Sequence, residues 1–250
     1  MGWYYRRLIV PRILSKCRKI ITVSHFECNR IRETLHLPED KIMPVYNGFS
    51  NHFHPLDNPK AVTQKYISTT GYLFFLGNTD PKKNTPRTLK AYHLYLQRSK
   101  EKRPLLIADL KPEYIDEILK ETGLEKIRPY LYLPGYIPNT DLPFIYNGAF
   151  AFLYTSLRES FGIPLLEAMA CGIPVITSNT SSMPEVGGDG AILTDPTDEQ
   201  SIANQLLLLE QDQDFYRKKS VYGLERAKYF SWKQTACELL ELYQSIIKSK

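Results

Sequence analysis

The fold of this chain is most clearly indicated by the stretch FAFLYTSLRESFGIPLLEAMACGIPVIT, residues 150–177. The apolar run at 150–154 predicts a buried strand, and a second apolar run at 175–177 predicts another. Between them a loop leads into a helix expected at 164–171. Parallel strands need a crossover of helix length, so this order is typical of a parallel sheet. The stretch therefore predicts an α/β fold.

The same alternation of short apolar runs and amphipathic segments extends from residue 71 to the C-terminal region. Further strands are expected at 72–76, 105–108, 131–133 and 191–194. Further helices are expected at 84–98, 112–122, 139–148, 198–210, 212–228 and 232–248. Short apolar strands separated by helices predict a Rossmann-like parallel sheet with helices on both faces. Ligands of such sheets bind at the carboxyl ends of the strands, so the loops there are the candidate site.

The N-terminal region is basic. Residues 1–50 hold nine Lys or Arg and four Asp or Glu, a balance of +5 that equals the net charge of the whole chain. A basic amphipathic helix is predicted at 3–19, and Ser24 is predicted to cap a helix at 25–36. The aromatic and basic residues at 3–7 allow two interpretations: peripheral contact with anionic lipid, or packing on a neighbouring domain. The charge is insufficient to predict nucleic-acid binding.

Composition and targeting signals favour a cytoplasmic protein, with peripheral contact at the inner membrane face as the alternative. Hydrophobic residues make up 43% of the chain, which is typical of a globular protein. The four cysteines show no disulfide or zinc pattern. No apolar run has the length of a membrane span, and no apolar region follows the N-terminal basic residues as in a signal peptide. Gly2 is not expected to be myristoylated, because Arg6 stands where the motif requires Ser or Thr.

Two carboxylates and two lysines mark the candidate site. Glu159 precedes a helix start, Glu167 lies eight positions further on, and Lys82 and Lys83 follow a turn at Gly77. A helix N-terminus and lysines suit an anion such as a diphosphate. Carboxylates beside an anion are unexpected unless they bind hydroxyl groups of the same ligand. A sugar and a ribose joined by a diphosphate satisfy both conditions.

These motifs resemble those of a known family. The segment at 158–174 resembles the Glu-x7-Glu signature of the retaining, group 1 (family 4) glycosyltransferases with the GT-B fold. The segment at 75–84 is similar to the family's phosphate loop, and the segment at 131–137 also fits the family pattern. Shorter matches lie at 45–48 and 178–186, in family order.

The resemblance implies a role for each matching residue. Lys83 and Glu159 would be the catalytic residues, with Lys83 offsetting diphosphate charge and Glu159 binding the transferred sugar. Glu167 would bind the ribose hydroxyls, and Tyr136 would flank the nucleobase. The full donor-binding set is Gly77, Asn78, Lys82, Lys83, Tyr136, Ile137, Glu159, Ser160, Phe161, Gly162, Ile163 and Glu167.

Each assignment has a simpler structural alternative. Lys82 and Lys83 fit a solvated basic loop, Glu159 an exposed loop acid, and Tyr136 an ordinary surface or core position. Glu167, expected in the first helical turn, would be stabilised there by the helix dipole. The chain also departs from the family twice. Asn78 stands where many relatives have Arg, and Ser160 stands where relatives usually have Gly.

No metal and no cofactor other than the donor substrate are predicted. The Asp-x-Asp pattern at 212–214 resembles that of metal-dependent sugar transferases, but it follows no strand and suits a helix cap instead. The five histidines show no metal-ligand spacing. A dinucleotide-dependent oxidoreductase is disfavoured, because no Gly-x-Gly-x-x-Gly follows the first strand of the sheet.

The resemblance also implies a domain organisation. Residues 1–50 would be a remnant of an N-terminal acceptor domain that is otherwise missing, 51–70 a linker, and 71–250 the donor-binding domain. The expected activity is transfer of a hexosyl unit, of mannosyl or glucosyl type, from a nucleoside diphosphate sugar to an acceptor hydroxyl with retention. The acceptor would be a glycan or lipid-linked sugar in polysaccharide or glycoconjugate synthesis. The alternatives are one subunit of a split enzyme, with an acceptor-domain partner protein, and a non-catalytic nucleotide-sugar-binding module.

Overall fold

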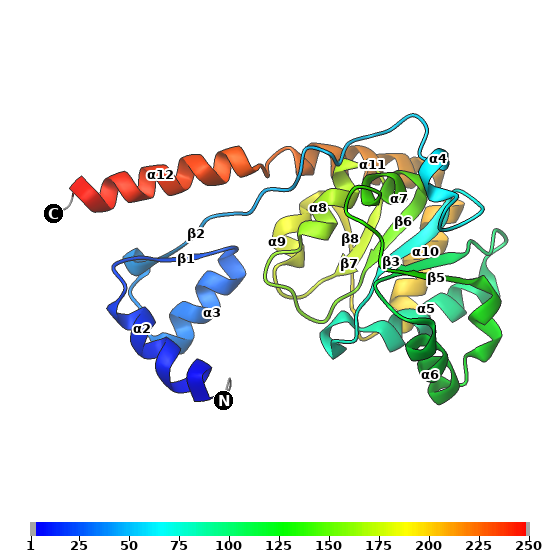
Figure 1. Ribbon diagram of the computed structural model, residues 1–250, viewed down its shortest axis with the longest axis horizontal. Coiled ribbons are helices and arrows are strands. Elements are labelled where there is room, and N and C mark those ends of the chain that lie inside the picture. Colours follow the sequence, from blue (N-terminus) through cyan, green and yellow to red (C-terminus); the bar gives the residue numbers. More distant parts are fainter. Residues whose placement is uncertain (1–3, 249–250) are drawn as a thin grey trace. The chain divides into compact units, whose positions relative to one another are not determined.

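The computed structural model describes residues 4–248 and divides into two compact units (Figure 1). The larger unit is Phe49–Tyr229, and the smaller unit combines Met1–Gly48 with Phe230–Lys250. Among the described residues, no helix has the length and apolar character needed to cross a bilayer.

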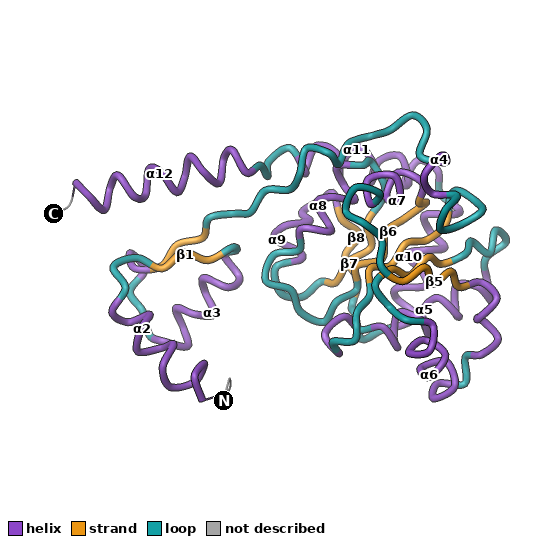
Figure 2. The backbone as a smooth tube through the Cα atoms, in the orientation of Figure 1, coloured by secondary structure: helices purple, strands orange, loops and turns teal. Residues whose placement is uncertain are grey.

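The larger unit is built on one sheet of six parallel strands, in the order β5-β4-β3-β6-β7-β8. Figure 2 shows the strands in orange, with helices around them. The strands are β3 (Tyr72–Leu76), β4 (Leu105–Ala108), β5 (Leu131–Gly135), β6 (Ala149–Tyr154), β7 (Val175–Ser178) and β8 (Ala191–Thr194). The helices are α4 (Lys60–Thr63), α5 (Thr85–Arg98), α6 (Pro112–Thr122), α7 (Leu142–Gly148), α8 (Ile163–Ala170), α9 (Met183–Gly187), α10 (Glu199–Gln211) and α11 (Gln213–Ala227). Short 3-10 segments lie at Pro81–Lys83, Glu125–Tyr130 and Gly188–Gly190. The predicted parallel α/β sheet is confirmed.

Both faces of the sheet are buried, which explains why its strands are apolar throughout. In β3, Leu73 and Phe75 belong to a core cluster that also holds residues of α5, α6 and α10. Phe74 alternates with them and packs on Tyr146 of α7, with ring centroids 5.2 Å apart. Alternate side chains of one strand thus contact helices on opposite faces.

The strand order reverses between β3 and β6. From β3 the chain proceeds outward to β4 and β5, and from β6 it proceeds the other way to β7 and β8. This is the strand order of the Rossmann fold, and its ligands bind outside the carboxyl ends of the strands where the order reverses. The loops that follow β3 and β6 are therefore the ones placed to form a site.

Within residues 4–248, the smaller unit contains a two-stranded parallel sheet, three α-helices, a π-helical turn and a 3-10 turn. Its elements are the turn at Tyr5–Ile9, α2 (Val10–Lys16), β1 (Ile20–Thr22), α3 (His25–Leu35), a 3-10 turn at Glu39–Lys41, β2 (Ile42–Pro44) and α12 (Trp232–Lys248). Ser24 caps α3 by accepting a hydrogen bond from the N–H of Glu27, as predicted. The helix expected at 3–19 instead consists of a π-helical turn and α2, which ends at Lys16. Residue 3 of that prediction lies outside the described residues.

These units differ from the domain boundaries expected from the sequence. Residues 230–250 group with the N-terminal segment because Phe230 packs on Tyr46, and the Thr235 hydroxyl donates to the Tyr46 carbonyl at 2.6 Å. A Cβ on Gly48 would lie 2.1 Å from the backbone nitrogen of Trp232, so the two segments are in close contact there. The expected linker at 51–70 lies within the larger unit and contains α4.

Candidate functional site

Lys83 and Glu159 meet at the carboxyl edge of the sheet, although 76 positions separate them in the sequence. Lys83 ends the 3-10 segment after β3, and Glu159 lies in the loop between β6 and α8. The Lys83 Nζ donates a 2.7 Å hydrogen bond to Glu159 Oε1, and each side chain is only 13% exposed. The structure therefore places both predicted catalytic residues where the strand order reverses.

Tyr154, the last residue of β6, lies beneath this pair. The Lys83 Nζ is 5.1 Å from the centroid of the Tyr154 ring, a distance typical of a cation–π contact. Burial raises the pKa of Tyr154 well above its ordinary value, and the charge of Glu159, a hydrogen bond to Glu159 and the charge of Glu167 raise it further. Tyr154 is thus a neutral phenol that interacts with both carboxylates of the predicted motif.

The loop that carries Glu159 is held by hydroxyl groups from residues 177–182. The Ser182 hydroxyl donates to the carbonyls of Glu159 and Phe161 at 3.0 and 3.2 Å, and the Ser181 hydroxyl accepts from the Glu159 N–H at 3.1 Å. Three more hydroxyls donate to carbonyls at the start of the loop: Thr177 to Tyr154, Ser178 to Ser156 and Thr180 to Leu157. The backbone at Glu159 is therefore fixed on both its N–H and C=O sides.

Asn84 joins three loops at the same edge. Its Nδ2 donates to the carbonyls of Thr155 and Pro196 at 3.0 and 2.7 Å, which connects the loops after β3, β6 and β8. Asn84 is buried and has a φ of 62°, a left-handed conformation that Asn adopts more readily than most residues. Asn84 lies at the end of the segment matched to the phosphate loop, and no separate role was predicted for it, although Asn is enriched in this conformation.

Glu167 lines a cavity of about 280 Å³ whose lining includes neither Lys83 nor Glu159. The other lining residues are Ser50, His52, Phe53, Asn139 and Thr140. The Tyr146 hydroxyl donates to Glu167 Oε2 at 3.3 Å. Burial raises the pKa of Glu167 to about 7, and the hydrogen bond from Tyr146 partly opposes this shift. The expectation that Glu167 lies in the first helical turn is wrong, because α8 begins at Ile163 and has no acidic residue in that turn.

Some of the remaining predicted site residues are buried, and others are exposed. Phe161 and Ile137 are buried, whereas Tyr136 is 71% exposed. Ser160 is exposed and has no left-handed φ, so the Gly-to-Ser difference from the family introduces no strain there. Gly162 has a φ of 100°, and a Cβ there would lie 2.6 Å from Met183 Cε.

The loop after β3 supports itself by short-range contacts. Asn78 Oδ1 accepts from the N–H of Asp80, and Asp80 Oδ1 accepts from the N–H of Lys82. The Lys82 Nζ lies 3.5 Å from Asp80 Oδ2 with both side chains about half exposed, so Lys82 forms a surface pair and Lys83 the inner one. At Gly77 a Cβ would lie 2.5 Å from Leu110 Cδ1, so a larger residue there would force the Leu110 side chain to shift.

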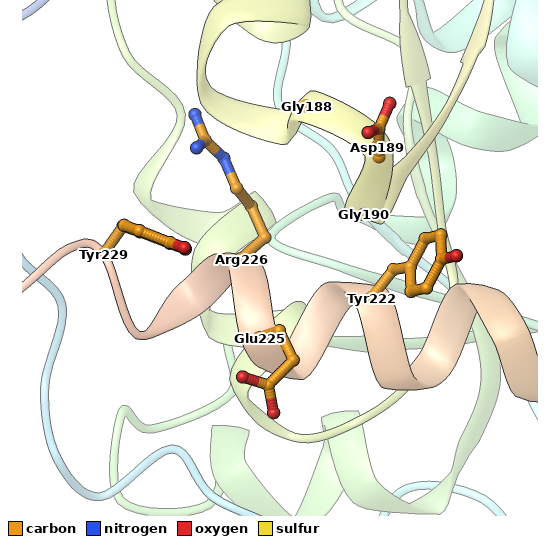
Figure 3. A pocket seen from close by; sticks show the side chains of 7 residues that line it. All are labelled: Gly188, Asp189, Gly190, Tyr222, Glu225, Arg226 and Tyr229. Atoms are coloured by element: carbon orange, nitrogen blue, oxygen red, sulfur yellow. The ribbon is translucent and has the colours of Figure 1, made fainter.

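A larger hollow of about 480 Å³ lies elsewhere in this unit (Figure 3). It is lined by Gly188, Asp189, Gly190, Tyr222, Glu225, Arg226 and Tyr229. Figure 3 shows Arg226 extending from α11 toward the Gly188 turn, and its guanidinium donates to the carbonyls of Val186 and Glu185. This turn directly precedes β8, so the hollow lies at the amino edge of the sheet, away from Lys83 and Glu159.

No metal-binding cluster of three or more His, Cys, Asp or Glu occurs in the part of the chain that the structure describes. Asp212 caps α11 by accepting from the N–H of Phe215 at 2.8 Å, as the sequence predicted. His52 is exposed and also lines the Glu167 cavity.

Comparison with known proteins identifies the family. The family described as "Glycosyl transferases group 1" matches residues 61–226. The chain belongs to the group 1 glycosyltransferases. Its fold is the Rossmann-like C-terminal half of the GT-B architecture. The matched range contains both loops that carry Lys83 and Glu159, and Glu167.

Several group 1 and related glycosyltransferases are similar to this chain. The O-antigen chain mannosyltransferase B of Escherichia coli is 33% identical over 92% of this chain and 61% of its own length. The chain thus spans about three fifths of that relative. Among solved structures, sucrose-phosphate synthase from Thermosynechococcus elongatus has a TM-score of 0.80 at 22% identity, covering 96% of this chain and 61% of its own. Anabaena HepE in complex with UDP and glucose has a TM-score of 0.81 at 19% identity, covering 96% and 66%.

Proposed function

We propose that this chain provides the donor-binding half of a retaining glycosyltransferase that transfers a hexosyl unit from a nucleoside diphosphate sugar to an acceptor hydroxyl. The observation that carries the proposal is the 2.7 Å contact between Lys83 and Glu159 at the point where the strand order reverses. A cation and a carboxylate together at this edge suit a ligand that is both anionic and rich in hydroxyls.

The proposed donor would extend across the edge of the sheet. Its diphosphate would lie at Lys83 and at the N-terminus of α8, where N–H groups and the helix dipole favour negative charge. Glu159 would accept hydrogen bonds from the sugar hydroxyls, and Glu167 from the ribose hydroxyls. Tyr136 and Ile137 would lie at the nucleobase, with Lys82 adding positive charge at the mouth of the loop.

The proposed chemistry needs stabilisation of charge on the departing diphosphate. As the glycosidic bond breaks, negative charge grows on the leaving oxygen, and the Lys83 ammonium stabilises it electrostatically. In this proposal no metal takes part, and the new bond forms at the anomeric carbon with retained configuration. The mannosyltransferase relative named above supports a hexose such as mannose, in synthesis of a polysaccharide or glycoconjugate.

Two alternatives share this donor site and differ in turnover. A split glycosyltransferase would transfer sugar only with an acceptor-domain partner protein, and a binding module would transfer none. Peripheral contact of the basic N-terminal segment with a membrane stays a separate prediction, as does a cytoplasmic location.

Calorimetric titration tests the proposed donor site. UDP-, GDP- and ADP-linked hexoses are titrated into the full chain and into its Lys83→Ala and Glu167→Ala variants. We expect one donor to bind, with affinity reduced at least about tenfold by Lys83→Ala, since a charge-assisted hydrogen bond contributes about 1.5–3 kcal/mol. Lys90→Ala, which removes an exposed lysine of α5, is the matched control. Absence of binding by any donor would reject the proposal.

A further inference from the structure

Lys83, the cation that the proposed donor would need, is already paired with Glu159. The Lys83 ammonium carries three N–H donors, and one of them is committed to Glu159 at 2.7 Å. With both side chains 13% exposed, water screens this pair only weakly. A donor diphosphate that approaches Lys83 therefore competes with an existing partner.

Charge decides this competition in favour of the diphosphate. A diphosphate ester carries more negative charge than one carboxylate and has several acceptor oxygens, so it attracts the ammonium more strongly. It also repels the Glu159 carboxylate, which has the same sign. Glu159 therefore needs other hydrogen-bond donors once Lys83 turns to the phosphate, because a carboxylate this poorly exposed is costly without partners.

Tyr154 provides one such donor within the protein. Its ring lies 5.1 Å from the Lys83 Nζ that holds Glu159, and it packs against Phe152 with centroids 5.6 Å apart. A side-chain hydrogen bond to Glu159 is among the causes that raise the pKa of Tyr154. The backbone of Glu159 is held at its N–H by Ser181 and at its C=O by Ser182. The carboxylate can consequently change partners by side-chain rotation alone, with the loop in place.

We infer that the Lys83–Glu159 pair exchanges partners when the donor binds: the diphosphate takes Lys83, and Tyr154 retains the released Glu159 carboxylate for the sugar hydroxyls. Tyr154 is then a positioning residue, acting through Glu159. This inference rests on the proposed function, and it couples recognition of the diphosphate to recognition of the sugar. Each half of the donor would bind better when the other half is present.

Titration with the nucleoside diphosphate alone tests the exchange. The nucleotide is UDP, GDP or ADP, whichever matches the donor that the unmodified chain binds. Glu159→Gln removes the competing charge, so we expect nucleoside diphosphate to bind about tenfold more tightly, which corresponds to 1.4 kcal/mol. Glu159→Asp, whose shorter side chain breaks the 2.7 Å contact, is expected to act in the same direction. Glu117→Gln, at an exposed position of α6, is the matched control.

Tyr154→Phe tests the positioning role, because it keeps the ring under Lys83 and removes only the hydroxyl. We expect the affinity of Tyr154→Phe for the nucleoside diphosphate to stay within about twofold of that of the unmodified chain. The ratio of nucleotide-sugar affinity to nucleoside-diphosphate affinity should fall about fivefold or more, because one hydrogen bond to a charged group is lost. Tyr92→Phe removes a hydroxyl that donates to the Arg103 carbonyl far from this edge, and is the control.

The outcomes separate the inference from the function on which it rests. If Lys83→Ala weakens binding but Glu159→Gln and Glu159→Asp do not strengthen it, the exchange is overturned and the donor site stands. If Tyr154→Phe weakens nucleotide and nucleotide sugar equally, the positioning role is overturned. If the unmodified chain binds neither ligand, both the inference and the proposed function fail.

Discussion

The backbone N–H of Leu157 donates a 2.7 Å hydrogen bond to the carbonyl oxygen of Lys82. This bond joins the loop after β3 to the loop after β6, one residue before Lys83 and two before Glu159. The side-chain pair is therefore supported by a backbone contact between the same loops. Local changes in either loop should affect both residues together.

Ser182→Ala should loosen the loop that carries Glu159. The Ser182 hydroxyl is buried and donates to the carbonyls of Glu159 and Phe161, so its removal leaves two acceptors without that donor. We expect a loss of about 1–3 kcal/mol in the free energy of unfolding and weaker binding of the nucleotide sugar. Urea unfolding and calorimetry measure the two effects. Ser220→Ala removes a hydroxyl that donates to the Gly172 carbonyl, and it should lower stability without changing binding.

Comparison of Asn84→Gly with Asn84→Ala should separate the contributions of backbone conformation and of hydrogen bonding to the free energy of unfolding. Both remove the donors to Thr155 and Pro196, but only alanine disfavours the left-handed φ of 62°. We expect glycine to cost about 1–3 kcal/mol of unfolding free energy, and alanine about 1 kcal/mol more. Equal urea midpoints for the unmodified chain and Asn84→Gly would show that the bonds joining the three loops contribute nothing.

Gly162→Ala should be more damaging than Gly123→Ala. Both glycines have a positive φ, but a Cβ meets Met183 Cε at 2.6 Å at position 162 and open space at position 123. We expect about 1 kcal/mol of backbone strain at Gly123 and about 2–4 kcal/mol at Gly162, where overpacking is added. Thermal unfolding of the two variants checks the order. Equal shifts in Tm would contradict the close packing of the α8 N-terminus on Met183.

Glu167 should make both stability and donor binding depend on pH near neutrality. Burial raises its pKa to about 7 in the folded protein, so folding favours the protonated form. The contribution of Glu167 to stability is fully present below its ordinary pKa and is lost as the pH rises toward and through about 7. The loss should reach up to ~3 kcal/mol by pH 8. Glu167→Gln should lack this part of the pH dependence of urea unfolding.

The same shift predicts proton-linked binding of the donor. Ribose hydroxyls donate hydrogen bonds to an ionised carboxylate, so binding by Glu167 should tighten as the pH rises through about 7. The diphosphate is itself charged, and His52 also lines the cavity, so the comparison needs Glu167→Gln at each pH. An identical pH profile for the variant and the unmodified chain would remove Glu167 from the ribose site.

Some features of the fold and site follow from local sequence, and others do not. The apolar run before Glu159 and the caps at Ser24 and Asp212 are local, and each predicted its element correctly. The 2.7 Å contact of Lys83 with Glu159 required the order of the strands, which the family resemblance implied and no local pattern contains.

Other features depend on packing between distant segments. Glu167 shares its cavity with Ser50, His52, Phe53, Asn139 and Thr140. Two of these residues fall in the segment 51–70, whose composition predicted a linker. Tyr154 was predicted only as a strand end, since nothing local distinguishes a tyrosine beneath an ion pair from one in the core. The grouping of Phe230 with Tyr46 likewise joins opposite ends of the chain.

A crystal structure of this chain with the nucleoside diphosphate sugar that it binds tests the central claim most directly. We predict that the diphosphate lies at the carboxyl edge between β3 and β6, with a phosphate oxygen within hydrogen-bonding distance of Lys83 Nζ. Glu159 should then contact sugar hydroxyls, and Glu167 the ribose. A nucleotide bound elsewhere, such as the hollow beside Arg226, with the 2.7 Å Lys83–Glu159 contact intact, would contradict the account.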